Sequence, residues 1–266
     1  VTRNVRPELT SICWHQGDVR EIAAMRELLF RLRPTHLLHL AWYTQPGAFW
    51  ASPENLLWLH SSVDLFRAFE ESGGTRIVAT GSCAEYDWTS GACHEQSTPC
   101  RPSTLYGRAK LAAANYLDAM CHARLSTAWA RLFFMYGPGS SEFRIPGAVI
   151  SPLNRNEPAK CSDGTQQRDF LHIDDVARGV ISLIDSEVTG PVNICSGTAT
   201  PIRWIAQRVA DMMGKSELLH LGALATSAQD PALIVGDNSR LRQELGWSPM
   251  MSLEDGLRHT IEHWKQ

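Results

Sequence analysis

Short apolar runs alternate along the chain with longer segments in which apolar residues have helical spacing. The runs THLLHLAW (35–42) and TRIVATGS (75–82) are typical of buried parallel strands, which are apolar on both faces. Between them, apolar residues recur at helical spacing from Leu56 to Phe66, and this segment stops at Gly73. Strands that alternate with helices predict a doubly wound α/β fold with a parallel sheet.

The alternation continues through the middle of the chain and then loosens. We predict a helix within 102–120 and a strand at 126–134. Beyond residue 140 we predict a helix at 173–185, a strand at 190–197, and capped helices at 200–214, 237–247 and 252–264. A smaller second lobe, built mainly from the C-terminal third, fits this pattern.

The composition is that of an ordinary globular protein. Of the 266 residues, 44% are hydrophobic and 20% are charged, and the net charge is −3. This balance provides no basic surface for nucleic acid or for an anionic membrane. No apolar run approaches the roughly 18–20 residues of a membrane span, and residues 1–10 lack the apolar core of a secretion signal. We therefore expect a cytoplasmic protein that acts on a small molecule.

The cysteines and histidines give no sign of a metal site. The seven cysteines are scattered, and their odd number and lack of a CxxC pair favour reduced thiols. The ten histidines lack HExxH spacing. We expect no bound metal. Cys83 is either a reactive thiol, for which no base is identifiable, or a small packed side chain.

The stretch TLYGRAK (104–110) places Tyr106 and Lys110 four residues apart in a predicted helix, so both lie on one face. A nearby ammonium favours the phenolate and lowers the pKa of a tyrosine from about 10. Such a tyrosine can exchange a proton when a carbonyl and an alcohol interconvert. The alternative is a half-buried tyrosine beside a solvated lysine.

Ser82 gives this pair a context, because it stands 24 residues before Tyr106 at the predicted carboxyl end of a strand. Open α/β sheets bind their ligands at that edge. A hydroxyl there can hydrogen-bond the substrate oxygen that Tyr106 protonates, although Ser82 alone could merely end the strand. The order strand, serine, loop, Tyr-x-x-x-Lys helix and strand is more specific than any of its parts.

Several stretches resemble the signatures of one enzyme family. They are QGDVRE, HLLHLAW, GSCAEYD, LYGRAK, RLFFMYGPG and DGTQQRDFLHIDDVARG, the last being especially distinctive. Almost end to end, the chain resembles the extended short-chain dehydrogenase/reductase family of nucleotide-sugar epimerases, dehydratases and reductases. The resemblance implies a Rossmann-like dinucleotide-binding domain and a substrate-binding lobe. We assign 1–140 and 173–195 to the first and 141–172 and 196–266 to the second.

The resemblance also implies roles for individual residues. The expected catalytic set is Ser82, Tyr106 and Lys110, with Lys110 also holding the nicotinamide ribose. The expected cofactor contacts are Arg3, Asp18, Val19, Leu40, Ala41, Tyr106, Lys110 and Phe133. The expected substrate contacts are Ser82, Cys83, Ala84 and Arg168. Arg168 is expected to grip a diphosphate through its forked guanidinium, unless it forms a structural ion pair with a neighbour such as Asp169.

Departures from the family pattern narrow the expected reaction. The 4,6-dehydratases carry an Asp-Glu pair where this chain has Cys83 and Ala84, so elimination of water is not expected. Glu85 and Tyr86 resemble the GSSEEYG stretch of the GDP-6-deoxy-mannose 4-reductases. Phe134 replaces an asparagine that usually helps to hold the diphosphate, and Ser227 stands where a second arginine is usual. Of that diphosphate clamp, Arg168 remains.

The family's Gly-rich turn, GxGxxG or GxxGxxG, is absent near the start of the chain. We expect a natural segment with the first strand and this turn to precede Val1; the alternative is a shortened member that cannot seat a dinucleotide. The stretch VTRN resembles the end of the second strand, which meets the adenosine 2′ position. Arg3 there would pair with a 2′-phosphate, so we expect NADP; the alternative is a solvated Arg3 and an enzyme that takes either NADP or NAD.

The sequence therefore predicts an NAD(P)-dependent reductase acting at a sugar carbon, C4 of a nucleotide-activated sugar. A 4-epimerase is the alternative within the family, and a non-catalytic nucleotide-binding relative is the alternative outside enzymes. We also expect a homodimer through the segments 54–72 and 103–122. Apolar residues lie on these segments beyond one face: Trp58, Phe69, Leu111 and Tyr116.

Overall fold

A computed structural model describes residues 11–227 and 230–264. Its centre is a parallel sheet of four strands, formed in the order β1 (His36–His39), β2 (Arg76–Ser82), β4 (Ser126–Leu132) and β8 (Gly190–Ile194). These are the four strands that the apolar runs predict. Strand β2 is buried along almost its whole length, as expected of a strand covered on both faces.

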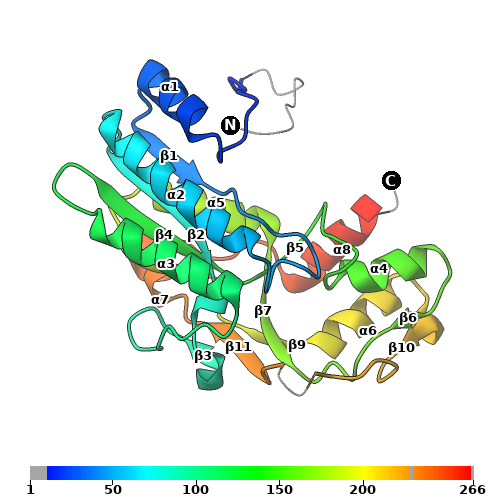
Figure 1. Ribbon diagram of the computed structural model, residues 1–266. Helices are drawn as coiled ribbons and strands as arrows, with labels where there is room; N and C mark the ends of the chain where they lie inside the picture. Colours follow the sequence, from blue (N-terminus) through cyan, green and yellow to red (C-terminus); the bar gives the residue numbers. More distant parts are fainter. Residues whose placement is uncertain (1–10, 228–229, 265–266) are drawn as a thin grey trace.

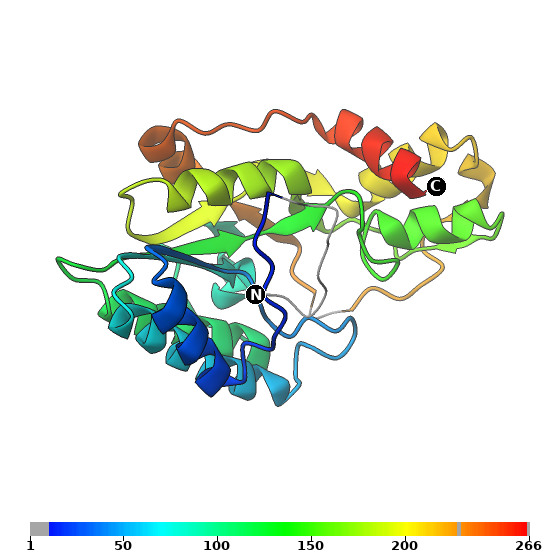
Figure 2. The ribbon, with the colours of Figure 1, turned by 90° about the horizontal axis from the view of Figure 1, so that it is seen from above.

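Helices cover both faces of this sheet (Figures 1 and 2). One face carries α1 (Ile22–Leu32), α2 (Glu54–Glu71) and α3 (Leu105–Ala119). The other face carries α5 (Ile173–Ile184) and α7 (Ser239–Leu245). The predicted doubly wound α/β fold is confirmed.

The core of the sheet domain has a layer on each side of the strands. On the side of α1, α2 and α3, Phe66 and Phe69 pack against Ile77 and Trp129. On the opposite side, Val180 and Leu183 of α5 pack against β2, β4 and β8. These side chains are removed from water, and their burial is the main stabilising contribution to the fold.

A second sheet lies beside the first. Its strands are ordered β3 (Ala92–Cys93), β11 (Leu233–Gly236), β7 (Gln167–His172) and β5 (Phe134–Tyr136), and β9 (Ala199–Pro201) pairs antiparallel with β7. These strands are short and come from distant parts of the chain. The sequence pattern predicted none of them as a sheet of its own.

The remaining elements form a lobe with its own core. It contains α4 (Gly147–Asn154), α6 (Ile202–Met212) and α8 (Leu253–Trp264), together with the strand pair β6 (Ala159–Lys160) and β10 (Leu219–His220). Three 3₁₀ turns complete the described elements: η1 (Cys83–Glu85), η2 (Trp88–Ser90) and η3 (Ser216–Leu218). The division that we propose between the two domains needs one change. Helix α7 lies within 196–266 but packs on β8, with Leu241 and Trp247 in the sheet-domain core.

Two of the apolar residues on which the predicted dimer surface was based, Trp58 and Phe69, are buried inside the chain and are not available to a partner. Phe69 lies in the layer between α2 and the sheet. The exposed apolar residues of α2 are Leu56 and Leu57. Among the described helices, none is both long enough and apolar enough to cross a membrane.

Candidate active site

Ser82 ends strand β2 at the carboxyl edge of the central sheet, where the chain turns into η1. Its Oγ accepts a hydrogen bond from the Ala84 N–H at 3.2 Å, and its own N–H donates to Glu85 Oε1 at 2.7 Å. This reciprocal pair is a capping box, which fixes both the backbone and the side chain of Ser82. The serine therefore has a defined position at the sheet edge.

Tyr106 and Lys110 lie in the first two turns of α3, which begins at a Thr104 cap whose Oγ1 accepts the Gly107 N–H at 3.0 Å. Gly107 allows this helix to approach the serine turn, because a Cβ at that position would lie 2.2 Å from the Ala84 carbonyl oxygen. The glycine inside LYGRAK thus brings Tyr106 close to Ser82.

The side chains of Tyr106 and Ser82 are neighbours in the site. Burial raises the pKa of Tyr106 to about 12, while the neighbouring Ser82 hydroxyl and Arg144 act to lower it. The ring is enclosed by aromatic neighbours, with edge-to-face contacts to Phe49 at 5.0 Å and to Trp50 at 5.7 Å between centroids. The cavity wall next to the hydroxyl is therefore apolar.

Lys110 does not lower the pKa of Tyr106 in this structure, contrary to our expectation. Its Nζ donates to the Thr80 carbonyl at 2.7 Å and lies 3.9 Å from the centroid of the Trp42 ring. The side chain is almost fully buried, and this burial lowers the pKa of Lys110 to about 7. An amine in this state exchanges a proton readily near neutral pH.

One cavity of about 600 Å³ joins these three residues. Leu40, Cys83, Phe133 and Arg168, all predicted from the sequence, also line it. Four other predicted residues do not. Ala41 and Ala84 are outside the lining, Val19 packs against the core below α1, and Asp18 forms an ion pair with Arg20 at 2.8 Å. Arg3 lies outside the described residues.

Arg168 lines the cavity and is at the same time paired with an acid. Its guanidinium is 2.5 Å from Asp230 Oδ1, and it also lies over the ring of Phe134 at 5.6 Å. Asp169, the ion-pair partner that the sequence suggested, instead accepts hydrogen bonds from Ser196, Gly197 and Gly236. A diphosphate at Arg168 would therefore have to share it with Asp230.

The cavity lining also includes aromatic and charged residues to which the sequence analysis gave no role. Among them are Trp42, which ends the HLLHLAW motif, and Phe49, Trp50, Trp88, Phe143 and Arg144, which lie outside the motifs. Most of them come from the loop after β1 and from the loop between β5 and α4, segments without helical or strand periodicity. Their aromatic content was the only signal in the sequence, and nothing there indicated that they meet at one place.

Cys83 is a packed residue rather than a reactive one. Burial raises the pKa of its thiol well above the usual range, and Cys93, Cys195 and Phe133 belong to the same apolar cluster. Two other groups of side chains lie close enough together to ligate a metal: His172 with Asp174 and His259, and His94 with Glu95 and Asp237. Neither group contributes to the lining of the main cavity.

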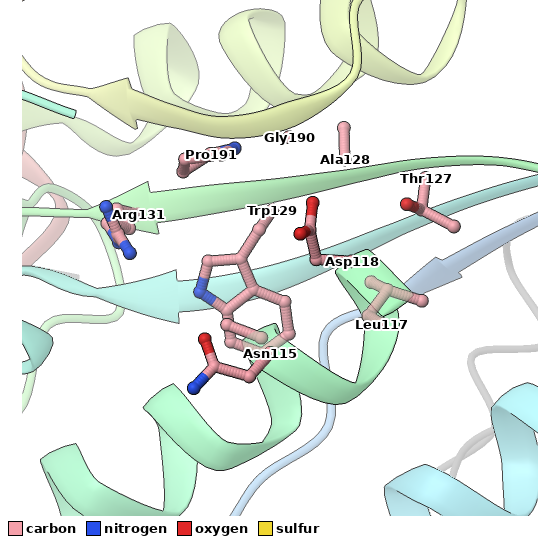
Figure 3. A pocket seen from close by; sticks show the side chains of 10 residues that line it. Asn115, Leu117, Asp118, Thr127, Ala128, Trp129, Arg131, Gly190 and Pro191 are labelled. Carbon is pink, nitrogen blue, oxygen red and sulfur yellow. The ribbon is translucent and has the colours of Figure 1, made fainter. Parts of the chain in front are cut away.

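A second, smaller cavity of about 150 Å³ lies between α3 and strands β4 and β8. Figure 3 shows Asn115 and Asp118 of α3 facing the β4 side chains there, including Trp129. It contains none of Ser82, Tyr106 and Lys110, so it is separate from the candidate active site.

Comparison with known proteins agrees with this geometry. Residues 2–195 match the model of the NAD-dependent epimerase/dehydratase family. The chain belongs to that family. A UDP-glucuronate 4-epimerase from Thermodesulfobacterium geofontis is 25% identical over 265 residues, which cover 95% of this chain and 79% of that protein. A dTDP-L-rhamnose 4-epimerase from Burkholderia thailandensis is 32% identical over 168 residues, which cover 60% of this chain and 46% of that protein.

Solved structures of this enzyme family have the same fold. MoeE5 in complex with UDP-glucose and NAD superposes with a TM-score of 0.81 and 26% identity, over 94% of this chain and 85% of that one. The UDP-glucose 4-epimerase of Thermotoga maritima, solved with UDP-glucose, gives a TM-score of 0.83 at 20% identity. The match covers 94% of this chain and 84% of that one. The protein is therefore an NAD-dependent enzyme of the nucleotide-sugar-modifying type. The predicted enzyme class is confirmed, although the sequence favoured NADP over NAD.

The residues around Tyr106 fit the nicotinamide end of NAD. Lys110 has a buried ammonium with donors to spare, since a single carbonyl accepts from it, and ribose hydroxyls are suitable further acceptors. Leu40, Gly81 and Phe133 line the cavity on the same side of the sheet edge. Asp18 and Val19, two of the expected cofactor contacts, do not line this cavity.

Proposed function

We propose that the protein is a nucleotide-sugar 4-epimerase that uses NAD at the cavity around Tyr106. The proposal is carried by Ser82, Tyr106 and the buried Lys110, which line one cavity together, with the side chains of Ser82 and Tyr106 as neighbours. They provide two groups for one sugar hydroxyl, of which one moves the proton and the other holds the oxygen. NAD supplies the hydride acceptor and donor.

Each residue has one step in the proposed reaction. Tyr106, acting as the phenolate, accepts the proton of the sugar hydroxyl as the alcohol becomes a ketone, and the resulting phenol returns it when the alcohol forms again. Ser82 holds the oxygen in both directions, because its capping box keeps the hydroxyl fixed. Lys110 binds the ribose next to the nicotinamide. The aromatic wall of Phe49 and Trp50 excludes water from the proton that is transferred.

Reduction of a 4-keto sugar is the second candidate, and the GSCAEYD motif is the observation that favours it. The side chain of Glu85, however, is turned away from the cavity and binds Arg131 and Trp129. The motif match therefore describes how the serine turn is held and carries little information about the substrate. The 4-epimerases among the similar proteins then favour epimerisation.

The deciding experiment measures the sugar product and the cofactor together. Purified full-length protein is incubated with UDP-glucose, UDP-glucuronate or dTDP-rhamnose, and the configuration at C4 is followed by proton NMR. An epimerase interconverts two sugars with no net change in absorbance at 340 nm. Oxidation of one NADPH for each molecule of a 4-keto sugar would establish the reductase instead. Binding without turnover of either kind would favour the non-catalytic alternative.

A further inference from the structure

Arg144 is a cavity cation that the proposed chemistry does not use. It lies in the loop between β5 and α4 and lines the same cavity as Tyr106. Its guanidinium carbon is 5.5 Å from the centroid of the Phe49 ring, and Phe49 is in turn in edge-to-face contact with Tyr106. Arg144 and Tyr106 therefore both contact the same aromatic side chain.

Three cationic side chains line this cavity in the described part of the chain, and their partners differ. Lys110 donates to the Thr80 carbonyl, and Arg168 is paired with Asp230. The Arg144 side chain has no hydrogen bond or ion pair with any described residue. Its guanidinium instead makes a cation–π contact with the face of the Phe49 ring. An arginine in this state has all its donors available for a ligand.

Among the described residues that line the cavity, the one acid is Asp230, and it is paired with Arg168 rather than with Arg144. Phe143 and Ile145 flank it in the loop, and Phe49 and Trp50 lie on the facing segment. A guanidinium on an aromatic surface binds a planar, two-oxygen anion especially well, because two parallel N–H groups match the two oxygens. The chemistry of the site therefore calls for a carboxylate or a phosphate.

The position of Arg144 decides between these two anions. Arg144 and Tyr106 contact the same Phe49 ring in one cavity, and Tyr106 marks the carbon that reacts. In a nucleotide hexose the substituent at C5 is adjacent to the reacting C4, whereas the diphosphate at C1 lies across the ring. We propose that Arg144 binds a carboxylate on the sugar ring, so that the substrate is a nucleotide-linked uronic acid. This inference rests on the proposed function, which identifies the reacting carbon.

The test compares an acidic sugar with its neutral counterpart. Binding of UDP-glucuronate, UDP-glucose and UDP is measured by calorimetry in the presence of NAD, for the wild type and for Arg144→Leu. We expect the wild type to prefer UDP-glucuronate by roughly 10- to 100-fold, the range of one charge-assisted contact, and Arg144→Leu to lose this preference. The affinity for UDP-glucose and for UDP should change little.

Two further variants sharpen the comparison. Arg144→Lys keeps the positive charge but loses the two parallel N–H groups of the guanidinium. Part of the preference for UDP-glucuronate over UDP-glucose should therefore remain. Arg258→Leu removes an exposed arginine of α8 that does not line the cavity, and it should leave all three affinities unchanged.

The outcomes separate this inference from the proposed function. If Arg144→Leu weakens the affinity for UDP-glucuronate, UDP-glucose and UDP equally, Arg144 binds the diphosphate. That result would overturn this inference but leave the proposed function standing. A wild type that binds and epimerises the neutral sugar as well as the acidic one would also overturn the inference alone. A protein that binds no UDP-sugar and no dTDP-sugar would refute the proposed function and the inference together.

Discussion

Glu85 and Arg131 form a buried ion pair directly behind Ser82. Arg131 Nε donates to Glu85 Oε2 at 2.8 Å, and the two side chains are 0% and 5% exposed. The other carboxylate oxygen of Glu85 accepts the Ser82 N–H and the Trp129 indole N–H. The pair therefore connects strand β4 to the turn that holds the serine.

Breaking this pair should be strongly destabilising. We expect Arg131→Met to lower the free energy of unfolding by about 3–5 kcal/mol, because a buried carboxylate loses its counter-charge. Urea denaturation measures the change. The matched control is Arg155→Met, which breaks an exposed pair with Glu157 and should cost about 0–1 kcal/mol.

A double variant tests whether the cost comes from the unpaired charge. Glu85→Gln/Arg131→Met should lose less stability than the sum of the two single variants, since no isolated charge remains. Additive losses would mean that the two side chains act independently, contrary to the buried pairing.

Tyr106→Phe should remove turnover while the fold and ligand binding are retained. The substitution deletes the hydroxyl next to Ser82 but keeps the ring and its contacts with Phe49 and Trp50. We expect the turnover rate to fall by about 10²–10⁴, with little change in the affinity for NAD. Tyr116→Phe, on the same helix but outside the cavity lining, is the control. A Tyr106→Phe enzyme as fast as the wild type would disprove the assigned role.

The buried Lys110 should make stability depend on pH. Burial lowers its pKa from 10.5 to about 7 in the folded protein. Between these values the unfolded chain binds a proton that the folded protein does not, so folding becomes more favourable as pH rises. Relative to Lys110→Met, the wild type should gain stability from about pH 7 to about pH 10.5, and the penalty should be complete below pH 7.

Urea unfolding of both proteins at pH 6, 8 and 10 measures this difference, with Lys160→Met at an exposed position as the control. A gap between wild type and Lys110→Met that is the same at all three pH values would show that the lysine does not change its protonation in this range.

We predict a homodimer through α2 and α3, which lie side by side on one face of the sheet (Figure 1). Leu56 and Leu57 are 52% and 55% exposed on α2 and would be covered in such a dimer. Light scattering should give about twice the 29.6 kDa mass of this chain. Leu57→Glu should shift the mass to that of a monomer, and Leu224→Glu, at an exposed position in the C-terminal lobe, should not.

Cofactor choice is a separate prediction that depends on Arg3. A charge-assisted hydrogen bond from Arg3 to a 2′-phosphate would favour NADP over NAD by roughly 10- to 100-fold. Affinities of the full-length protein for both cofactors, with and without Arg3→Ala, test it. The proposed epimerase uses NAD, as the similar structures do. Tighter binding of NAD by the unmutated protein would therefore show that Arg3 does not select the cofactor, and tighter binding of NADP that disappears in Arg3→Ala would show that it does.

The larger elements could be predicted because their signals are local. The apolar runs of β1, β2, β4 and β8 and the glycine and threonine signals at the helix ends are read from a few adjacent residues. Ile22, Met25 and Leu29 have the same helical spacing, but no helix was predicted where α1 lies. The second sheet had none, because its strands are two to six residues long and pair across large sequence separations.

The site was predictable where a motif fixes the backbone. Ser82 and Tyr106 meet because a capping box and a glycine contact hold the two segments together, and both are encoded in GSCAEYD and LYGRAK. The charges around Tyr106 were not predictable in this way. Helical spacing predicted the face of the helix on which Lys110 lies, but it could not predict the contact of Lys110 with Trp42. Arg144 belongs to a loop without a regular sequence pattern, so its place in the cavity could not be predicted either.

Trp42, Trp50 and Trp88 line the cavity around the reacting hydroxyl. Tryptophan fluorescence depends on the polarity around the indole ring and on nearby quenchers. The fluorescence of these three residues therefore reports on what occupies the cavity. A nicotinamide or a sugar that enters the cavity displaces water from these rings, and the emission maximum should move accordingly. Ligand binding can thus be followed without any label, on the unmodified protein and at the speed of a stopped-flow experiment.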